Sequence, residues 1–179
     1  MKLTIFLITI LVFSMSVFAQ KKPSITAVTS VANETVTVEG SLKNGAKLSS
    51  LSWASSSSIA CFPATQNAKF NGNHVFFSTA IPTRSIMTIT VKPKDASKNL
   101  SLYAYEIGAN KTILPEDLAS AVTCEADHKW DYPKKGKTQT EARTVMLNAI
   151  QNPYNVIIGV AGADGLTDAD FTLEISLKQ

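Results

Sequence analysis

Side chains that ligate metals or carry out acid–base chemistry are scarce in this sequence. Its 179 residues include two histidines and two cysteines, and charged residues make up 17% of the chain. Tetrahedral zinc sites take their ligands mainly from histidine and cysteine, so a zinc centre is not expected. The motifs Gly-x-Ser-x-Gly and His-Glu-x-x-His and a phosphate-binding glycine loop are also missing from the sequence. The sequence therefore predicts that the protein is not an enzyme.

A strong positive charge is lacking as well. The formal net charge is +3, and no stripe of basic residues is interleaved with aromatic ones. Proteins that bind nucleic acid usually show such a stripe, so nucleic acid is not an expected partner. The densest basic segment, Lys134-Lys135-Gly136-Lys137, is interpreted as a solvated loop.

One long apolar run is present, and it stands at the N-terminus. Lys2 precedes the apolar stretch 3–12, and Val17 and Ala19 occupy the −3 and −1 positions of a signal peptidase site. We expect residues 1–19 to be a signal peptide and residues 20–179 to form a single β-sandwich domain. The processed protein is then secreted or periplasmic, with no membrane insertion after cleavage.

The two cysteines would enter an oxidising compartment on export. We predict a disulfide between Cys61 and Cys124, and the alternative is two buried free thiols. A bridge closing a loop of about 64 residues would stabilise the fold by about 4 kcal/mol in the chain-entropy model.

Alternating apolar and polar residues fill much of the remaining chain. The alternation is clearest in residues 154–160 and 171–178, which we expect to form the closing strand pair, and it recurs in 35–39, 86–92 and 100–105. Period-two alternation at short spacing predicts an all-β protein, an antiparallel jelly-roll-like β-sandwich. At most one short helix is expected, beginning at Pro115. The ambiguous segment 140–150 is interpreted as a strand.

Four segments within residues 70–177 resemble the bacterial pre-peptidase C-terminal (PPC) domain. They are the turn and strand FNGNHVFF at 70–77, a central pair formed by 87–93 and LSLYAY at 100–105, the strand at 154–162, and a closing DFTLEI at 170–175. The resemblance implies a jelly-roll-like β-sandwich of an exported bacterial protein. It also implies a stand-alone binding or accessory module.

Three acidic residues surround a glycine in the last loop. Asp164, Asp168 and Asp170 flank Gly165, and hard cations prefer carboxylate oxygens, so calcium is a better metal hypothesis than zinc. The alternative is that Asp and Gly are there because they favour turns.

Aromatic residues supply the candidate ligand-binding positions. Trp130 and Tyr132 lie in a polar cluster, and Tyr103 and Tyr105 share one face of their strand. Exposed rings stack on sugars, whereas rings on a buried strand face pack across strands, and both interpretations stay open.

These features together favour a secreted non-catalytic binding or accessory module that recognises an extracellular protein or polysaccharide. The alternative is a structural or assembly partner of a separately encoded exported enzyme. A calcium-dependent enzyme or hydrolase is the third hypothesis. The sequence leaves the oligomeric state open.

Overall fold

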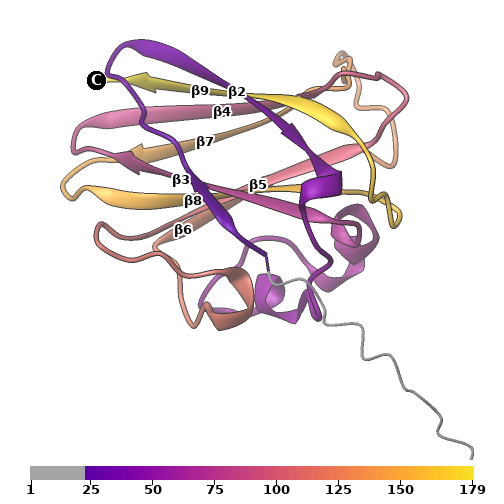
Figure 1. The fold of residues 1–179 in the computed structure, drawn as a ribbon, viewed down its shortest axis with the longest axis horizontal. Helices are drawn as coiled ribbons and strands as arrows, with labels where there is room; N and C mark the ends of the chain where they lie inside the picture. Colours follow the sequence, from indigo (N-terminus) through magenta and orange to yellow (C-terminus); the bar gives the residue numbers. More distant parts are fainter. Residues whose placement is uncertain (1–22) are drawn as a thin grey trace, which may run out of the picture.

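Two stacked β-sheets make up residues 23–179, the part of the chain that the computed structural model describes (Figure 1). The predicted signal peptide, residues 1–19, lies outside the described residues. The five-stranded sheet has the order β1-β3-β8-β5-β6, and the four-stranded sheet has the order β2-β9-β4-β7. The all-β sandwich predicted from the sequence is therefore confirmed.

Successive strands alternate between the two sheets along the chain, except that β5 and β6 both belong to the five-stranded sheet. Those of the five-stranded sheet are β1 (Ile25–Ala27), β3 (His74–Ile81), β5 (Leu100–Gly108), β6 (Thr123–Asp127) and β8 (Tyr154–Gly162). Those of the four-stranded sheet are β2 (Glu34–Ser41), β4 (Ser85–Pro93), β7 (Arg143–Ala149) and β9 (Asp170–Lys178). All neighbouring strands are antiparallel except β1 and β3, which run parallel.

The helical segments are short 3-10 helices, and residues 23–179 contain no α-helix. They are η1 (Leu42–Asn44), η2 (Ser52–Ser55), η3 (Ala64–Phe70) and η4 (Pro115–Asp117). The short helix expected at Pro115 is η4. The ambiguous segment 140–150 contains β7, as the sequence predicts.

The expected strand pairs are wrong, because their members belong to different sheets. The sequence predicts β8 with β9 as the closing pair and β4 with β5 as the central pair. In the structure β8 pairs with β3 and β5, and β9 pairs with β2 and β4. Residues 163–169 cross from one sheet to the other. Alternation shows only that one face of each strand is buried. It does not tell whether two strands are hydrogen-bonded neighbours in one sheet or face each other from opposite sheets.

The five-stranded sheet is buried on both sides. One side packs against the four-stranded sheet, where Leu102 and Ile158 face Ile89 and Ile175 in the larger core. The other side is covered by the segments that carry η2, η3 and η4, as the lower part of Figure 1 shows. A second, aromatic core lies there. Every residue of β5 except the terminal Gly108 is buried.

Tyr103 lies at the centre of this aromatic core. Its ring is 5.3 Å from Trp53 and 6.0 Å from Phe70, measured between centroids. The ring lies over Gly159, its partner on β8, where a Cβ atom would come within 2.2 Å of the tyrosine Cζ. Glycine is therefore required at position 159 by the close approach of the ring.

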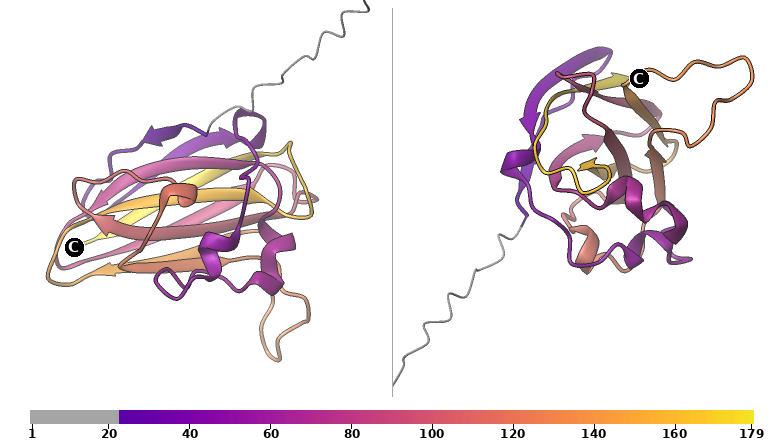
Figure 2. Two further views of the ribbon diagram at one scale, coloured as in Figure 1. Left: turned by 90° about the horizontal axis from the view of Figure 1, so that it is seen from below. Right: turned by 90° about the vertical axis from the view of Figure 1, so that its right-hand side faces the viewer.

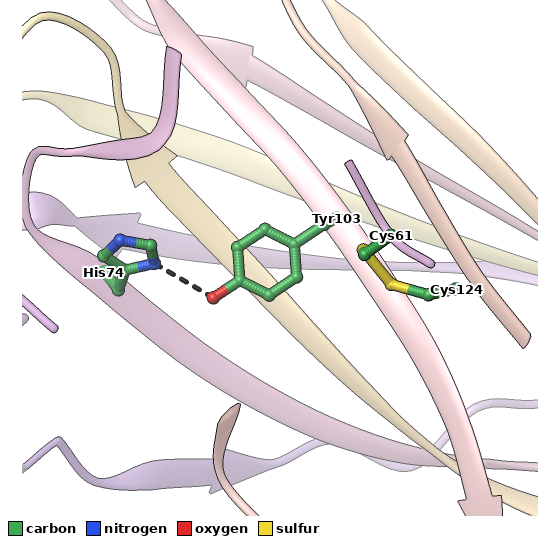
Figure 3. Close-up of a disulfide and its surroundings, with 4 residues drawn as sticks. All are labelled: Cys61, His74, Tyr103 and Cys124. Carbon is green, nitrogen blue, oxygen red and sulfur yellow. Dashed lines mark hydrogen bonds between the residues drawn. A yellow bond between two sulfur atoms is a disulfide. The ribbon is translucent and has the colours of Figure 1, made fainter. Parts of the chain in front are cut away.

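His74 is paired with the hydroxyl of Tyr103, at 2.9 Å from Nδ1 (Figure 3). Its Nε2 lies 2.8 Å from the carbonyl oxygen of Phe70, which can only accept, so Nε2 carries the proton and Tyr103 donates to Nδ1. Burial of this residue, which is 1% exposed, lowers the pKa of His74 from 6.5 to about 4. The imidazole is therefore neutral and fully hydrogen-bonded inside the protein.

The predicted disulfide between Cys61 and Cys124 is confirmed. It joins the segment between η2 and η3 to β6, the edge strand of the five-stranded sheet. Figure 3 shows it close to the ring of Tyr103. The bridge therefore holds the covering segment against the sheet.

We expect Tyr103→Phe to lower the free energy of unfolding by about 1–3 kcal/mol, because Nδ1 of His74 then stays buried without a partner. Urea denaturation at pH 7 measures the change. Tyr132→Phe is the matched control, since that side chain is 82% exposed and should change stability by less than about 0.5 kcal/mol. Equal effects in the two variants would contradict a role for the buried hydrogen bond.

Replacing both cysteines, Cys61→Ala with Cys124→Ala, is expected to lower the free energy of unfolding by about 4 kcal/mol. The bridge closes a separation of 63 residues, and its loss gives the unfolded chain more conformational freedom. Urea denaturation of the double variant and of the unreduced protein measures the difference. A loss below about 1 kcal/mol would show that the bridge adds little to stability.

Candidate functional site

The loop joining β6 to β7, residues 128–142, projects from the body of the sandwich, as both views in Figure 2 show. We call it the 128–142 loop. The side chain of Gln139 braces it from within. Its Oε1 accepts from the backbone N–H of Trp130 at 2.8 Å, and its Nε2 donates to the carbonyl of His128 at 2.8 Å. The base of the loop is therefore held in one conformation.

An ion pair ties the loop to the covering segment. Lys69, in η3, contacts the carboxylate of Asp131. This hydrogen bond holds the pKa of Asp131 below its ordinary value of 3.8. Because Cys124 lies in the preceding strand, the loop is anchored at its start by the disulfide and farther along by Lys69.

A hollow of about 450 Å³ lies against the base of the 128–142 loop. It is lined by Gln66, Ala126, Asp127, His128, Trp130, Asp131, Tyr132, Pro133 and Lys134. The ammonium of Lys134 lies 4.3 Å from the centroid of the Trp130 ring, a cation–π contact. Tyr132 is 82% exposed. The structure thus brings together two of the four predicted aromatic residues, in a loop with aromatic, acidic and basic groups.

The other two predicted residues, Tyr103 and Tyr105, do not form an exposed strip. Both are fully buried in the aromatic core, and the hydroxyl of Tyr105 donates to the carbonyl of Ile113 at 2.6 Å. Burial raises the pKa of each tyrosine well above its ordinary value. The prediction that they contact a ligand is wrong, because the segments carrying η2 to η4 cover this face of β5.

The three acidic residues of the calcium hypothesis are not gathered into one site. Asp168 lies 3.2 Å from the ammonium of Lys43. The backbone N–H of Asp164 donates to Ala68, and Asp170 begins β9. Within residues 23–179 no group of three His, Cys, Asp or Glu side chains is placed to hold a metal ion. Their loop is a connection between sheets.

A second hollow, of about 440 Å³, opens beside the edge strands β6 and β7, toward the end of β6 that is farther from the 128–142 loop. We call it the Glu106 groove. It is lined by Glu106, Val122, Thr123, Glu125, Met146, Leu147, Asn148, Ile150, Gln151, Asn152 and Tyr154. None of the residues that line it was predicted from the sequence to bind a ligand.

Glu106 is the unusual residue of this groove. It is 1% exposed, and its Oε1 is buried with no hydrogen-bond partner in the described part of the chain. Burial raises the pKa of Glu106 from 4.5 to about 7. The sequence does carry a signal for it, since Glu106 continues the inward-facing positions of Leu102 and Ala104 on one strand.

Among the solved structures that are similar to this chain are the following three. The pre-peptidase C-terminal domain of a collagenase from Bacillus anthracis is 11% identical, with a TM-score of 0.45, and the match covers 89% of this chain and 100% of that domain. PliG, a periplasmic inhibitor of g-type lysozyme from Aeromonas hydrophila, is 15% identical with a TM-score of 0.38, covering 87% and 99%.

The third structure is CorA, a surface-associated copper-binding protein of Methylomicrobium album BG8. It is 9% identical with a TM-score of 0.43, and the match covers 87% of this chain and 97% of that one. The PPC domain, which the sequence resembles, is thus found again by structure comparison. At these identities and TM-scores the likeness carries no conclusion about a shared family or a ligand.

No protein-family model and no curated protein matches the chain. Across residues 23–179, no helix has both the length and the apolar character needed to cross a bilayer.

Glu106 should make the protein less stable as the pH rises. A carboxyl whose pKa is raised on folding favours the folded state below pH 4.5, and this contribution is lost as the pH rises through about 7. The shift in pKa sets an upper limit of about 3 kcal/mol on this loss of stability. The actual loss is smaller, because the groove opens to water, which screens the charge of Glu106. Urea denaturation from pH 4.5 to 8 should therefore show the wild type losing stability relative to Glu106→Gln.

The comparison with Glu106→Gln isolates this effect from that of His74. The lowered pKa of His74 stabilises the fold above pH 6.5 and loses this contribution as the pH falls through about 4, which is the opposite dependence. Both proteins retain His74, so its contribution cancels. Parallel stability curves for the two proteins would contradict the raised pKa of Glu106.

Proposed function

We propose that this protein is an exported, non-catalytic binding module that recognises an extracellular protein or polysaccharide through the 128–142 loop. The observation that carries the proposal is the exposed ring of Tyr132 beside the hollow lined by Trp130. Binding residues are concentrated on loops that a rigid scaffold positions, and tyrosine and tryptophan are the residues most enriched at the centres of interfaces.

The bracing of the loop supports this function. A loop that is ordered before binding loses less conformational entropy when its target arrives. Gln139 holds the loop from inside, and the contact of Lys69 with Asp131 holds it from outside. The disulfide fixes the strand from which the loop leaves and is suited to an oxidising compartment.

The charge of the loop favours an acidic target. Its projecting part carries Lys134, Lys135 and Lys137, all exposed, and Asp131 is already paired with Lys69. Basic groups on a protruding loop attract acidic surfaces over a range of about 8–10 Å at physiological ionic strength. We therefore infer that an acidic polysaccharide, or an acidic face of an extracellular protein, is the preferred target.

Binding should be lost when the aromatic residues of the loop are truncated. We expect Tyr132→Ala and Trp130→Ala each to weaken target binding by tenfold or more, because a central aromatic side chain at an interface contributes about 2 kcal/mol or more. A glycan array with neutral and acidic sugars, set beside affinity capture from the extracellular fraction, identifies the target. Titration calorimetry then measures the affinity of each variant for that target.

Lys178→Ala serves as the matched control, because Lys178 is an exposed residue at the end of β9 in the other sheet. The affinity of the Lys178→Ala variant for the target should equal that of the wild type. Saturable glycan binding that depends on Tyr132 supports recognition of polysaccharide, and capture of one stoichiometric protein through the same residue supports recognition of protein. Binding that survives both aromatic substitutions would overturn the assignment to this loop.

A further inference from the structure

The Glu106 groove holds a carboxylate that the fold itself does not satisfy. Glu106 is 1% exposed, and its buried Oε1 finds no donor anywhere in residues 23–179. An unpartnered buried polar atom costs free energy, and a native protein usually provides a partner or uses the group. By contrast, buried His74 has both ring nitrogens satisfied. Seven side-chain atoms within residues 23–179 are buried without a partner, and Oε1 of Glu106 is the one carboxyl oxygen among them, which makes it the strongest candidate for pairing with a ligand.

The groups around the groove are acidic or neutral. From β6, Thr123 and Glu125 face it, and their partners across the sheet are Glu106 and Ala104. Strand β7 contributes Met146, Leu147 and Asn148, the turn after it contributes Ile150, Gln151 and Asn152, and β8 contributes Tyr154. No lysine or arginine occurs among the described residues that line the groove.

Arg84 lines a neighbouring hollow together with Ile150 and Gln151, which also line the Glu106 groove. Burial is the one cause of the raised pKa of Glu106, so no cation of the protein offsets it. The groove thus presents two carboxyl groups, of Glu106 and Glu125, without a matching positive charge. Its charge is complementary to a cation.

The rim of the groove is apolar. Val122 is 58% exposed, Met146 is 62% exposed and Ile150 is 67% exposed, and all three line the groove. Exposed apolar side chains around a recessed polar group are typical of sites for ligands with an apolar body and one polar end. The volume of about 440 Å³ lies in the usual range for a small molecule.

We propose that the Glu106 groove binds a small aliphatic amine. Its ammonium group pairs with the buried carboxylate of Glu106 and with Glu125, and its carbon chain lies against Val122, Met146 and Ile150. This site is separate from the 128–142 loop, and the proposal for it does not depend on the function proposed for that loop.

Binding of such a ligand depends on pH. Because Glu106 has a pKa of about 7, it is largely ionised at pH 8 and largely protonated at pH 5.5. An aliphatic ammonium remains charged at both values, since its pKa is near that of lysine, about 10.4. Affinity therefore rises with pH, by about tenfold to thirtyfold between pH 5.5 and 8.

The test is a titration of the folded, disulfide-containing protein with n-hexylamine, followed by two-dimensional amide NMR. At pH 8 we expect saturable shifts in the amides of Glu106, Val122 and Ile150, and an affinity about tenfold to thirtyfold lower at pH 5.5. The neutral probe n-hexanol has the same carbon chain and should bind at least about tenfold more weakly at pH 8.

Variants distinguish this site from general attraction to surface acids. Glu106→Gln keeps the size of the side chain and should abolish the preference for hexylamine over hexanol. Glu34→Gln, an exposed acid on β2 in the other sheet, should leave binding unchanged. The amide spectrum of each variant reports whether it is folded. Equal binding of the two probes, or hexylamine binding unaltered in Glu106→Gln, would overturn the proposal.

A second ligand tests whether the groove binds a small amine or the lysine side chain of a partner protein. N-acetyl-lysine methylamide carries the same ammonium on a chain flanked by peptide groups. Binding of hexylamine at least as tight as that of the lysine derivative supports a small-molecule site. Saturable binding of the lysine derivative without binding of hexylamine would assign the groove to a partner protein and overturn the proposal.

Discussion

The structure depends on burial of both faces of the five-stranded sheet. In a β-sandwich, each sheet ordinarily buries one face and exposes the other to water. Here β5 is buried along its length on both faces, and β8 is nearly so. The second face is covered by irregular chain with short 3-10 turns, which packs through Trp53, Phe62 and Phe70. This irregular chain is attached to the sheet by side-chain packing, by hydrogen bonds such as that from Tyr105 to Ile113, and by the bridge between Cys61 and Cys124.

This arrangement moves the candidate binding sites to one edge of the molecule. With both of its faces occupied, the five-stranded sheet offers a ligand only its strand edges and its loops. The 128–142 loop leaves one end of β6, and the Glu106 groove lies toward its other end. Because β6 carries Cys124, the strand between the two sites is covalently attached to the covering segment. A rigid edge strand is a suitable support for both sites.

The sequence was sufficient to predict the strands, the sandwich and the disulfide, because each leaves a local signal. It was not sufficient to assign strands to sheets, since alternation looks the same in a hairpin and in strands that face each other, as with β8 and β9. Tyr103 and Tyr105 show a related limit. Their alternation with Leu102 and Ala104 predicts a second face. The residues that cover this face, however, lie about 30 to 50 positions earlier in the chain and about 10 to 15 positions later.

Two of the buried ionisable groups, His74 and Glu106, show how a structural role differs from a functional one. His74 lies in the aromatic core with both nitrogens hydrogen-bonded, so its lowered pKa is explained by packing. Glu106 lies at the border of the larger core, where an apolar residue would continue the pattern of Leu102 and Ala104. A leucine at position 106 would avoid burying a carboxylate, at a saving of about 1–3 kcal/mol. A group that costs stability and opens onto a groove is better explained by binding than by folding.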